Sequence, residues 1–105
     1  MNDNHGLTDK QRQQLVEVFV DYPSIEAVKI YGSRAKGNYT NTSDIDLAMF
    51  GQNIDRFLIA DLLMELNETD IPFLIDAQNY HALKNIRLKD HIDRVGQYIY
   101  RRDEQ

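Results

Sequence analysis

Apolar residues recur at helical spacing near the start of the chain, between positions 15 and 22. Thr8 precedes this run, and Gln11 lies three residues after Thr8, an arrangement typical of a capping box at the first turn of a helix. Pro23 ends the predicted helix, because the residue before a proline avoids helical geometry. The stretch 1–7 is mostly polar, and it predicts a loose tail.

Three later runs are rich in β-branched and apolar residues, which is typical of strands. These runs lie at 25–31, 45–50 and 71–77. Helical spacing returns at 54–67 and again over 88–99, although 98–100 also fits a short extended segment. This order predicts a single domain over 1–105 with an α/β (α+β) fold, in which a small mixed β-sheet has its helices packed mainly on one face.

Most of the candidate functional residues lie between the first two predicted strands and at the start of the second. Gly32 directly follows a strand, where a glycine lets the backbone approach a ligand closely. Ser33 then begins a predicted helical turn, where its hydroxyl and the free backbone amides suit a phosphate, and Gly37 permits a sharp exit. Asp44 and Asp46 lie two positions apart, so in a strand their carboxylates project from one face.

Asp76 is an acid in a third strand that otherwise reads as buried, and a buried acid needs a partner. If this strand pairs with the second one, Asp76 reaches the face of Asp44 and Asp46. Converging carboxylates repel one another unless a cation separates them, and oxygen ligands favour Mg²⁺. The three acids together predict a site for two magnesium ions that serves phosphoryl transfer. Asp44 and Asp46 alone are more typical of a solvated turn, and Asp76 alone is equally typical of a capping or salt-bridged residue.

Two known motifs, the P-loop and the EF-hand, partly match this segment, but each lacks one required residue. Gly32 and Gly37 have the spacing of a P-loop, but Asn38 stands where the phosphate-binding lysine is required. Asp44 and Asp46 begin like an EF-hand, but Ala48 stands where the third oxygen ligand is required. The glycine-rich fingerprint of dinucleotide-binding folds is also missing from the sequence.

Charge and composition narrow the class of protein further. The net charge of −5, with scattered Lys and Arg residues, disfavours a long nucleic acid and suits a basic protein partner. The sequence has no cysteine, and therefore neither a disulfide framework nor a thiolate metal site. No apolar run reaches the roughly 18 residues of a membrane span, and the polar N-terminus has no signal-peptide core. We therefore expect a cytoplasmic protein without a membrane partner.

At these residues the sequence resembles the minimal nucleotidyltransferase (MNT) family, within the superfamily of DNA polymerase beta-type nucleotidyltransferases. The motif combines a Gly-Ser pair, a glycine a few residues later, a Ser-Asp-x-Asp-Leu segment and a third acid on a later strand. In this chain these are Gly32-Ser33, Gly37, Ser43-Asp44-Ile45-Asp46-Leu47 and Asp76. The resemblance implies the nucleotidyltransferase fold and a magnesium-dependent transfer of AMP from ATP to a hydroxyl group.

The resemblance also implies roles for individual residues. The catalytic residues and metal ligands would be Asp44, Asp46 and Asp76, of which Asp76 activates the acceptor hydroxyl directly or through a metal. The nucleotide-binding residues would be Gly32, Ser33, Arg34, Gly37 and Ser43. Arg34 and Lys36 are either helpers at the phosphates or solvated side chains, and Tyr39 is either an edge residue or a stacking partner for the base. None of the three histidines shows a ligand pattern.

Minimal members of this family act as antitoxins beside HEPN ribonucleases, and some adenylylate a tyrosine of that toxin. The resemblance therefore implies a HEPN-type toxin as partner in a hetero-oligomer, with the transferase as its antitoxin. Two alternatives remain open on the sequence. One is an antitoxin that neutralises its partner by contact alone, and the other is a small-molecule nucleotidyltransferase with a pocket between subunits.

Overall fold

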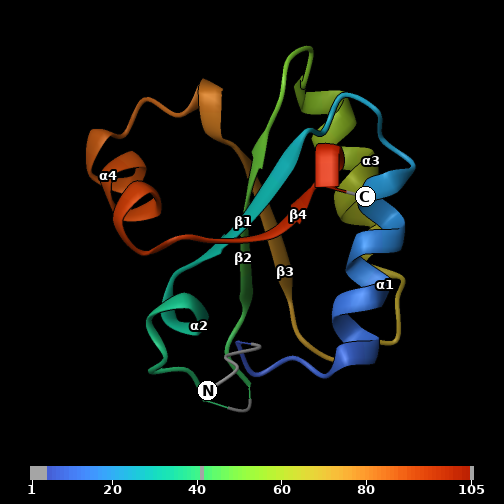
Figure 1. Cartoon of the computed structure of the whole chain (residues 1–105), viewed down its shortest axis with the longest axis vertical. Helices are drawn as coiled ribbons and strands as arrows, with labels where there is room; N and C mark the ends of the chain where they lie inside the picture. Colours follow the sequence, from blue (N-terminus) through green and yellow to red (C-terminus); the bar gives the residue numbers. More distant parts are fainter. Residues whose placement is uncertain (1–4, 41, 105) are drawn as a thin grey trace.

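A four-stranded sheet forms the centre of the protein, whose computed structural model describes residues 5–40 and 42–104. The strands are β1 (Ala27–Tyr31), β2 (Ile45–Phe50), β3 (Ile75–Asn79) and β4 (Gln97–Arg101). Their spatial order is β3-β2-β1-β4 (Figure 1). β1 runs antiparallel to both β2 and β4, whereas β2 and β3 are parallel. The predicted mixed sheet is therefore confirmed.

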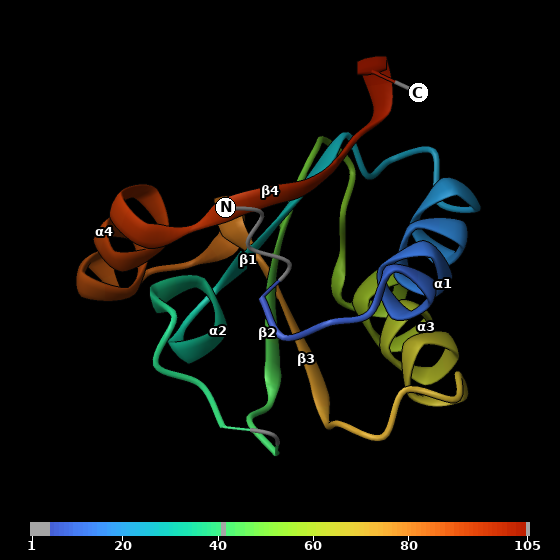
Figure 2. The ribbon, with the colours of Figure 1, turned by 60° about the horizontal axis from the view of Figure 1, so that its bottom comes forward.

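Helices lie on both sides of this sheet. They are α1 (Asp9–Val20), α2 (Ser33–Lys36), α3 (Arg56–Asn67) and α4 (Ile86–Val95), with 3-10 turns η1 (Tyr80–Ala82) and η2 (Arg102–Glu104). The two longest helices, α1 and α3, cover one face together, while α2 and α4 lie on the other side (Figure 2). The prediction that helices pack mainly on one face therefore holds for the two longest helices, α1 and α3, while α2 and α4 lie on the other face. No helix within the described residues is long and apolar enough to cross a membrane.

Alternation along the strands sends apolar and functional side chains to opposite faces of the sheet. In β2, the fully buried Leu47 and Met49 join the main core with residues of α1 and α3. Asp46 and Ala48 point to the other face, where Ala48 packs with Ile92 of α4 and Tyr31 of β1. The sheet therefore separates the main core from the face on which the acids lie.

Several elements follow the predictions closely. The capping box of α1 forms as expected, since the Thr8 side chain accepts from the Gln11 amide and the Gln11 side chain accepts from the Thr8 amide, both at 3.0 Å. β2 has the predicted bounds. The C-terminal segment takes the extended alternative as β4, which begins directly after Gly96, where a Cβ would collide with the Ile92 carbonyl oxygen.

Several boundaries differ from the predictions, since β1 starts at Ala27 rather than at 25 and α3 at Arg56 rather than at 54. β3 starts at Ile75 rather than at 71, beyond Pro72, which lacks an amide for the ladder. The predicted loose tail is wrong for residues 5–7, because Leu7 is buried in the main core and His5 is buried near Gln97, whose Oε1 lies 2.7 Å from His5 Nε2. The rest of that predicted tail, 1–4, lies outside the described residues.

Candidate active site

Adjacent strands bring two of the predicted acids side by side. In the parallel ladder of β2 and β3, Asp46 pairs with Asp76, and the flanking pair Ile45–Ile75 packs into the main core on the opposite face. Paired residues on neighbouring strands lie about 4.8 Å apart along the hydrogen-bonding direction. The predicted pairing of the second and third strands is confirmed, and it places both carboxylates on the side of α2 and α4.

The acids influence one another and their surroundings electrostatically. Burial raises the pKa of Asp46, and the charges of Asp76 and Asp44 raise that pKa further, while a protonated His91 would lower it. Tyr31, which pairs with Asp46 across β1 and β2, has its pKa raised to about 12 by burial and by the charges of Asp46 and Asp76. Negative charge is thus concentrated at the start of β2 and on the neighbouring β3, an arrangement that favours a cation.

Two glycines bound the short helix α2 beside the acids. Gly32 precedes it with φ +77° and ψ −151°, a conformation that is essentially restricted to glycine. A Cβ on Gly32 would lie 2.6 Å from Asp46 Oδ2, so the backbone and the carboxylate are in close approach. Gly37 ends α2 in the left-handed region at φ +86°. The backbone conformation therefore requires glycine at 32, and a side chain there would also displace the Asp46 carboxylate.

The two predicted serines occupy different positions. Ser33 is the first residue of α2, and among the described residues its hydroxyl has no hydrogen-bond partner. Ser43 lies before β2, and its Oγ accepts a hydrogen bond from the Thr40 amide at 2.8 Å. Ser33 is thus available to a ligand beside Gly32, whereas Ser43 closes the turn that leads to Asp44.

Arg34 faces the protein rather than the open side of the site. Its side chain is only 1% exposed, and its Nε and Nη2 donate to the Ser43 carbonyl oxygen at 3.1 and 2.7 Å. Its Nη1 donates to the His5 carbonyl oxygen at 2.8 Å, and the guanidinium lies 4.4 Å from the Phe73 ring centroid. Burial lowers the pKa of Arg34, an effect that Tyr39 and Asp44 oppose. In this arrangement Arg34 fixes the approach to β2.

The neighbours of Arg34 include Tyr39, which the sequence left as either an edge residue or a stacking partner for the base. Tyr39 lies with its ring centroid 5.5 Å from the Arg34 guanidinium carbon, and it packs against Gly6, at which a Cβ would lie 2.6 Å from the ring. Lys36, by contrast, is exposed at the end of α2. The structure therefore shows Tyr39 in contact with the N-terminal segment and Lys36 in solvent.

His91 is a residue of this site that the sequence did not reveal. Its Nε2 accepts a hydrogen bond from the Gly32 amide at 3.1 Å, and its ring meets the Tyr31 ring edge-on with 6.0 Å between centroids. Since a backbone amide can only donate, this Nε2 carries no proton in the arrangement shown. His91 comes from α4, far from Gly32 in the sequence, so no local spacing could have indicated the contact.

The acids could supply only part of the ligand shell of a divalent cation. Within the described residues, no group of three or more His, Cys, Asp or Glu side chains is arranged to hold a metal ion. Mg²⁺, however, commonly binds through one or two carboxylates together with substrate phosphates and waters. The paired Asp46 and Asp76, with Asp44 close enough to affect the pKa of Asp46, provide such an incomplete set of oxygen ligands.

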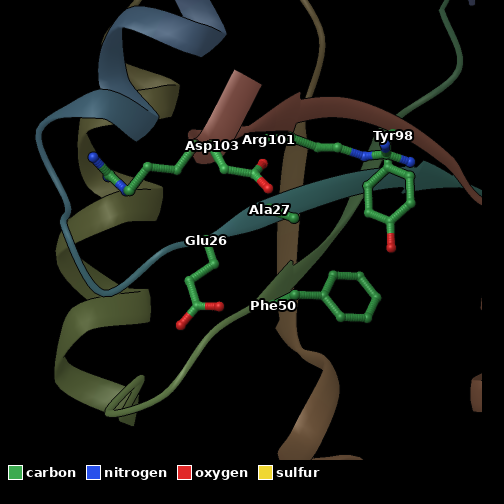
Figure 3. Close-up of a pocket in the computed structure, with 7 residues that line it drawn as sticks. Glu26, Ala27, Phe50, Tyr98, Arg101 and Asp103 are labelled. Carbon is green, nitrogen blue, oxygen red and sulfur yellow. The ribbon is translucent and has the colours of Figure 1, made fainter. Parts of the chain in front are cut away.

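A separate pocket of about 540 Å³ lies at the other end of β2. It is lined by Glu26, Ala27, Phe50, Tyr98, Arg101, Arg102 and Asp103. Figure 3 shows the Phe50 and Tyr98 rings at one side of it and the Glu26 carboxylate at the other. Arg102 donates to the carbonyl oxygens of Ile25 and Tyr22, and the Arg101 guanidinium lies 3.9 Å from the Tyr98 centroid. Because the pocket contains none of the three acids, we place the candidate active site at Asp46 and Asp76.

The fold with this arrangement of strands and helices is that of a nucleotidyltransferase. The family model described as polymerase beta, nucleotidyltransferase matches residues 13–105, and the chain belongs to that family. Comparison with curated proteins gives no significant match.

Solved structures with a similar fold include components of toxin–antitoxin systems. A crystal structure of a toxin–antitoxin with AMP-PNP has a TM-score of 0.74 and 17% identity, over 89% of this chain and 75% of that one. The structure of a tri-AMPylated Shewanella oneidensis HEPN toxin in complex with an MNT antitoxin has a TM-score of 0.71 and 14% identity, over 93% of this chain and 76% of that one. A putative nucleotidyltransferase from Sulfolobus solfataricus has a TM-score of 0.56 and 22% identity, over 90% of this chain and 81% of that one. At these identities the similarity concerns the fold.

Proposed function

We propose that this nucleotidyltransferase moves AMP from ATP to a hydroxyl group, that of a tyrosine, on a HEPN-type toxin and thereby acts as its antitoxin. The observation that carries the proposal is the pairing of Asp46 with Asp76 beside the Gly32–Ser33 turn. The structures of similar fold support the choice of substrates, since one of them contains AMP-PNP and another an AMPylated HEPN toxin with its MNT antitoxin.

The proposed transfer is a substitution at phosphorus. The acceptor oxygen forms a bond to the α-phosphorus of ATP, the bond from that phosphorus to the bridging oxygen breaks, and pyrophosphate leaves with the bonding electrons. Asp76 is exposed, so its carboxylate can take the proton of the acceptor hydroxyl. Ser33 offers its hydroxyl to the phosphates, next to the turn that Gly32 forms.

The negative charge of the acids and the phosphates makes a divalent cation part of the proposal. Asp46 and Asp76, together with Asp44, would hold Mg²⁺, which would neutralise the charge that the phosphates bring to these carboxylates. Arg34 supports the same site without contacting the nucleotide, because its hydrogen bonds to the Ser43 and His5 carbonyl oxygens fix the loop that carries Asp44.

The test is transfer to the purified partner. The chain, ATP, Mg²⁺ and a purified HEPN-type protein that binds it are mixed, and intact-mass spectrometry should find the partner heavier by one or more adenylyl groups. Asp46→Asn should abolish the mass change while the two proteins still bind. Asp61→Asn is the matched control, since Asp61 is an exposed acid on α3 at the opposite face and should leave the transfer intact.

An unmodified partner in a stable complex would replace this proposal with neutralisation by contact. Transfer to a free small-molecule hydroxyl, with none to the protein, would replace it with a small-molecule transferase. A protein that carries AMP on a residue other than tyrosine would retain the activity and correct the acceptor.

A further inference from the structure

The Gly32 amide already has a partner inside the protein. It donates to His91 Nε2 at 3.1 Å across the gap between α4 and the turn that follows β1. Without His91 this partly buried amide would lose its acceptor, which is costly for a backbone donor. Gly32 therefore depends on a side chain from the C-terminal part of the chain for its position.

α4 holds the His91 ring firmly in place. The next residue, Ile92, is fully buried against Tyr31 and Ala48, and the Gly96 amide donates to the Ile92 carbonyl oxygen at 2.8 Å. The His91 ring itself meets Tyr31 edge-on. The imidazole thus presents Nε2 to Gly32 from an element that packs directly on β1.

A small movement of Gly32 has consequences on both sides. Towards β2, Gly32 lies against the Asp46 carboxylate, since a Cβ on Gly32 would lie 2.6 Å from Asp46 Oδ2. In the other direction Ser33 follows immediately as the first residue of α2. A shift of Gly32 would therefore carry Ser33 with it and change the contact with the Asp46 carboxylate.

We propose that His91 is a positioning residue for nucleotide binding, which acts through the Gly32 amide and does not touch the substrate. The inference rests on the proposed function, and it adds a residue from α4 to a site that the motif alone places between β1 and β2. It also assigns the Gly32 amide to His91 rather than to a phosphate, so that Ser33 is the group of the turn that meets the nucleotide.

The variants separate the hydrogen bond from the bulk of the ring. His91→Gln keeps an acceptor oxygen near the place of Nε2, whereas His91→Phe keeps the ring and removes the acceptor. The control is His81→Phe, because His81 also lies near the sheet, edge-on to Phe50 and Tyr80, but is far from Gly32. Thermal unfolding of each variant establishes that the fold is retained.

We expect His91→Phe to weaken Mg–ATP binding about tenfold, equal to about 1.4 kcal/mol, which is within the usual effect of orphaning a buried donor. The KM for ATP should rise by the same factor with little change in the KM for the acceptor protein. His91→Gln should return both quantities to within about threefold of the wild type, and His81→Phe should not change them. A purely structural role would lower stability without this division between the two substrates.

Two measurements keep the inference independent of catalysis. Mg–ATP affinity is obtained by calorimetry without the acceptor, and hydrogen exchange of the Gly32 amide should accelerate in His91→Phe but not in His91→Gln. If the wild type binds Mg–ATP but transfers no AMP, the proposed function fails while the role of His91 is still decided by affinity. Equal affinity in His91→Phe and wild type overturns the inference, as does His91→Gln behaving like His91→Phe. A wild type that binds no nucleotide overturns both proposals.

Discussion

Asp46→Asn should stabilise the metal-free protein at neutral pH. In the folded chain the pKa of Asp46 is raised above its ordinary value of 3.8, first by burial and then by the charges of Asp76 and Asp44. The folded state therefore binds the proton more tightly than the unfolded state does, and stability falls as the pH rises from 3.8 through the higher folded value. Above that window the loss is complete, and Asn removes it.

The repulsion between the charges, which adds to the larger effect of burial, can be sized from the separation of the strands. Two unit charges about 4.8 Å apart repel by about 1 kcal/mol in water and by about 3 kcal/mol at an effective dielectric constant of 20. Asp76 is exposed, so the value nearer to that in water applies. We expect the free energy of unfolding to rise by about 1 kcal/mol, which corresponds to about 4–8 °C in Tm for a domain of this size.

The assay is thermal unfolding in the presence of a chelator, at pH 7 and at about pH 3. The gain from Asp46→Asn should be present at pH 7 and vanish at the lower pH, where both aspartate and asparagine are neutral. Asp61→Asn, on the opposite face, is the control for a general loss of one negative charge from a chain of net charge −5. A gain that persists at low pH, or one that the control reproduces, would refute the electrostatic account.

Three further predictions concern the surroundings of the acids. Gly32→Ala should lower the free energy of unfolding, measured in urea, by about 1–3 kcal/mol through its backbone conformation alone. The contact of the new Cβ with Asp46 should add a further loss, which should be smaller when Gly32→Ala is made in an Asp46→Ala background. Arg34→Lys should lower it by about 2 kcal/mol, because an ammonium cannot reproduce the forked donation to the Ser43 carbonyl oxygen, and urea unfolding should show this with the net charge unchanged. Tyr31 should ionise near pH 12 by ultraviolet absorbance, and Asp46→Asn should lower that value by removing one of the charges that raise it.

The elements that sequence patterns predicted well are those fixed by neighbouring residues. The capping box of Thr8 and Gln11 is complete within four positions, and β2 is a continuous apolar run with acids at its start. Strand parity also gave the shared face of Asp46 and Asp76 on the condition that their strands pair, whereas the parallel direction and the register come from the structure. Local rules thus account for most of the framework around the acids.

The contacts that sequence patterns missed join distant parts of the chain. His91 reaches Gly32 from α4, and Arg34 reaches the His5 carbonyl oxygen in a segment that its composition marks as loose. In both cases the partner on one side is a backbone group, which every residue carries and which therefore leaves no signature in the sequence. The direction of Arg34, into the protein rather than towards a phosphate, follows from those carbonyl groups.

The repulsion between Asp46 and Asp76 connects the stability of the chain with its proposed activity. A fold that holds two like charges on adjacent strands is less stable than one with a neutral pair, and the main core on the other face of the sheet must compensate for the difference. A divalent cation bound by these carboxylates would remove the same repulsion, so it would stabilise the folded state and bind more tightly because the acids are held together. The Gly32 turn, held by His91, lies directly against this carboxylate, since a Cβ on Gly32 would come within 2.6 Å of Asp46 Oδ2. Contacts from the β1 turn and from α4 therefore surround the position at which the acids concentrate their charge.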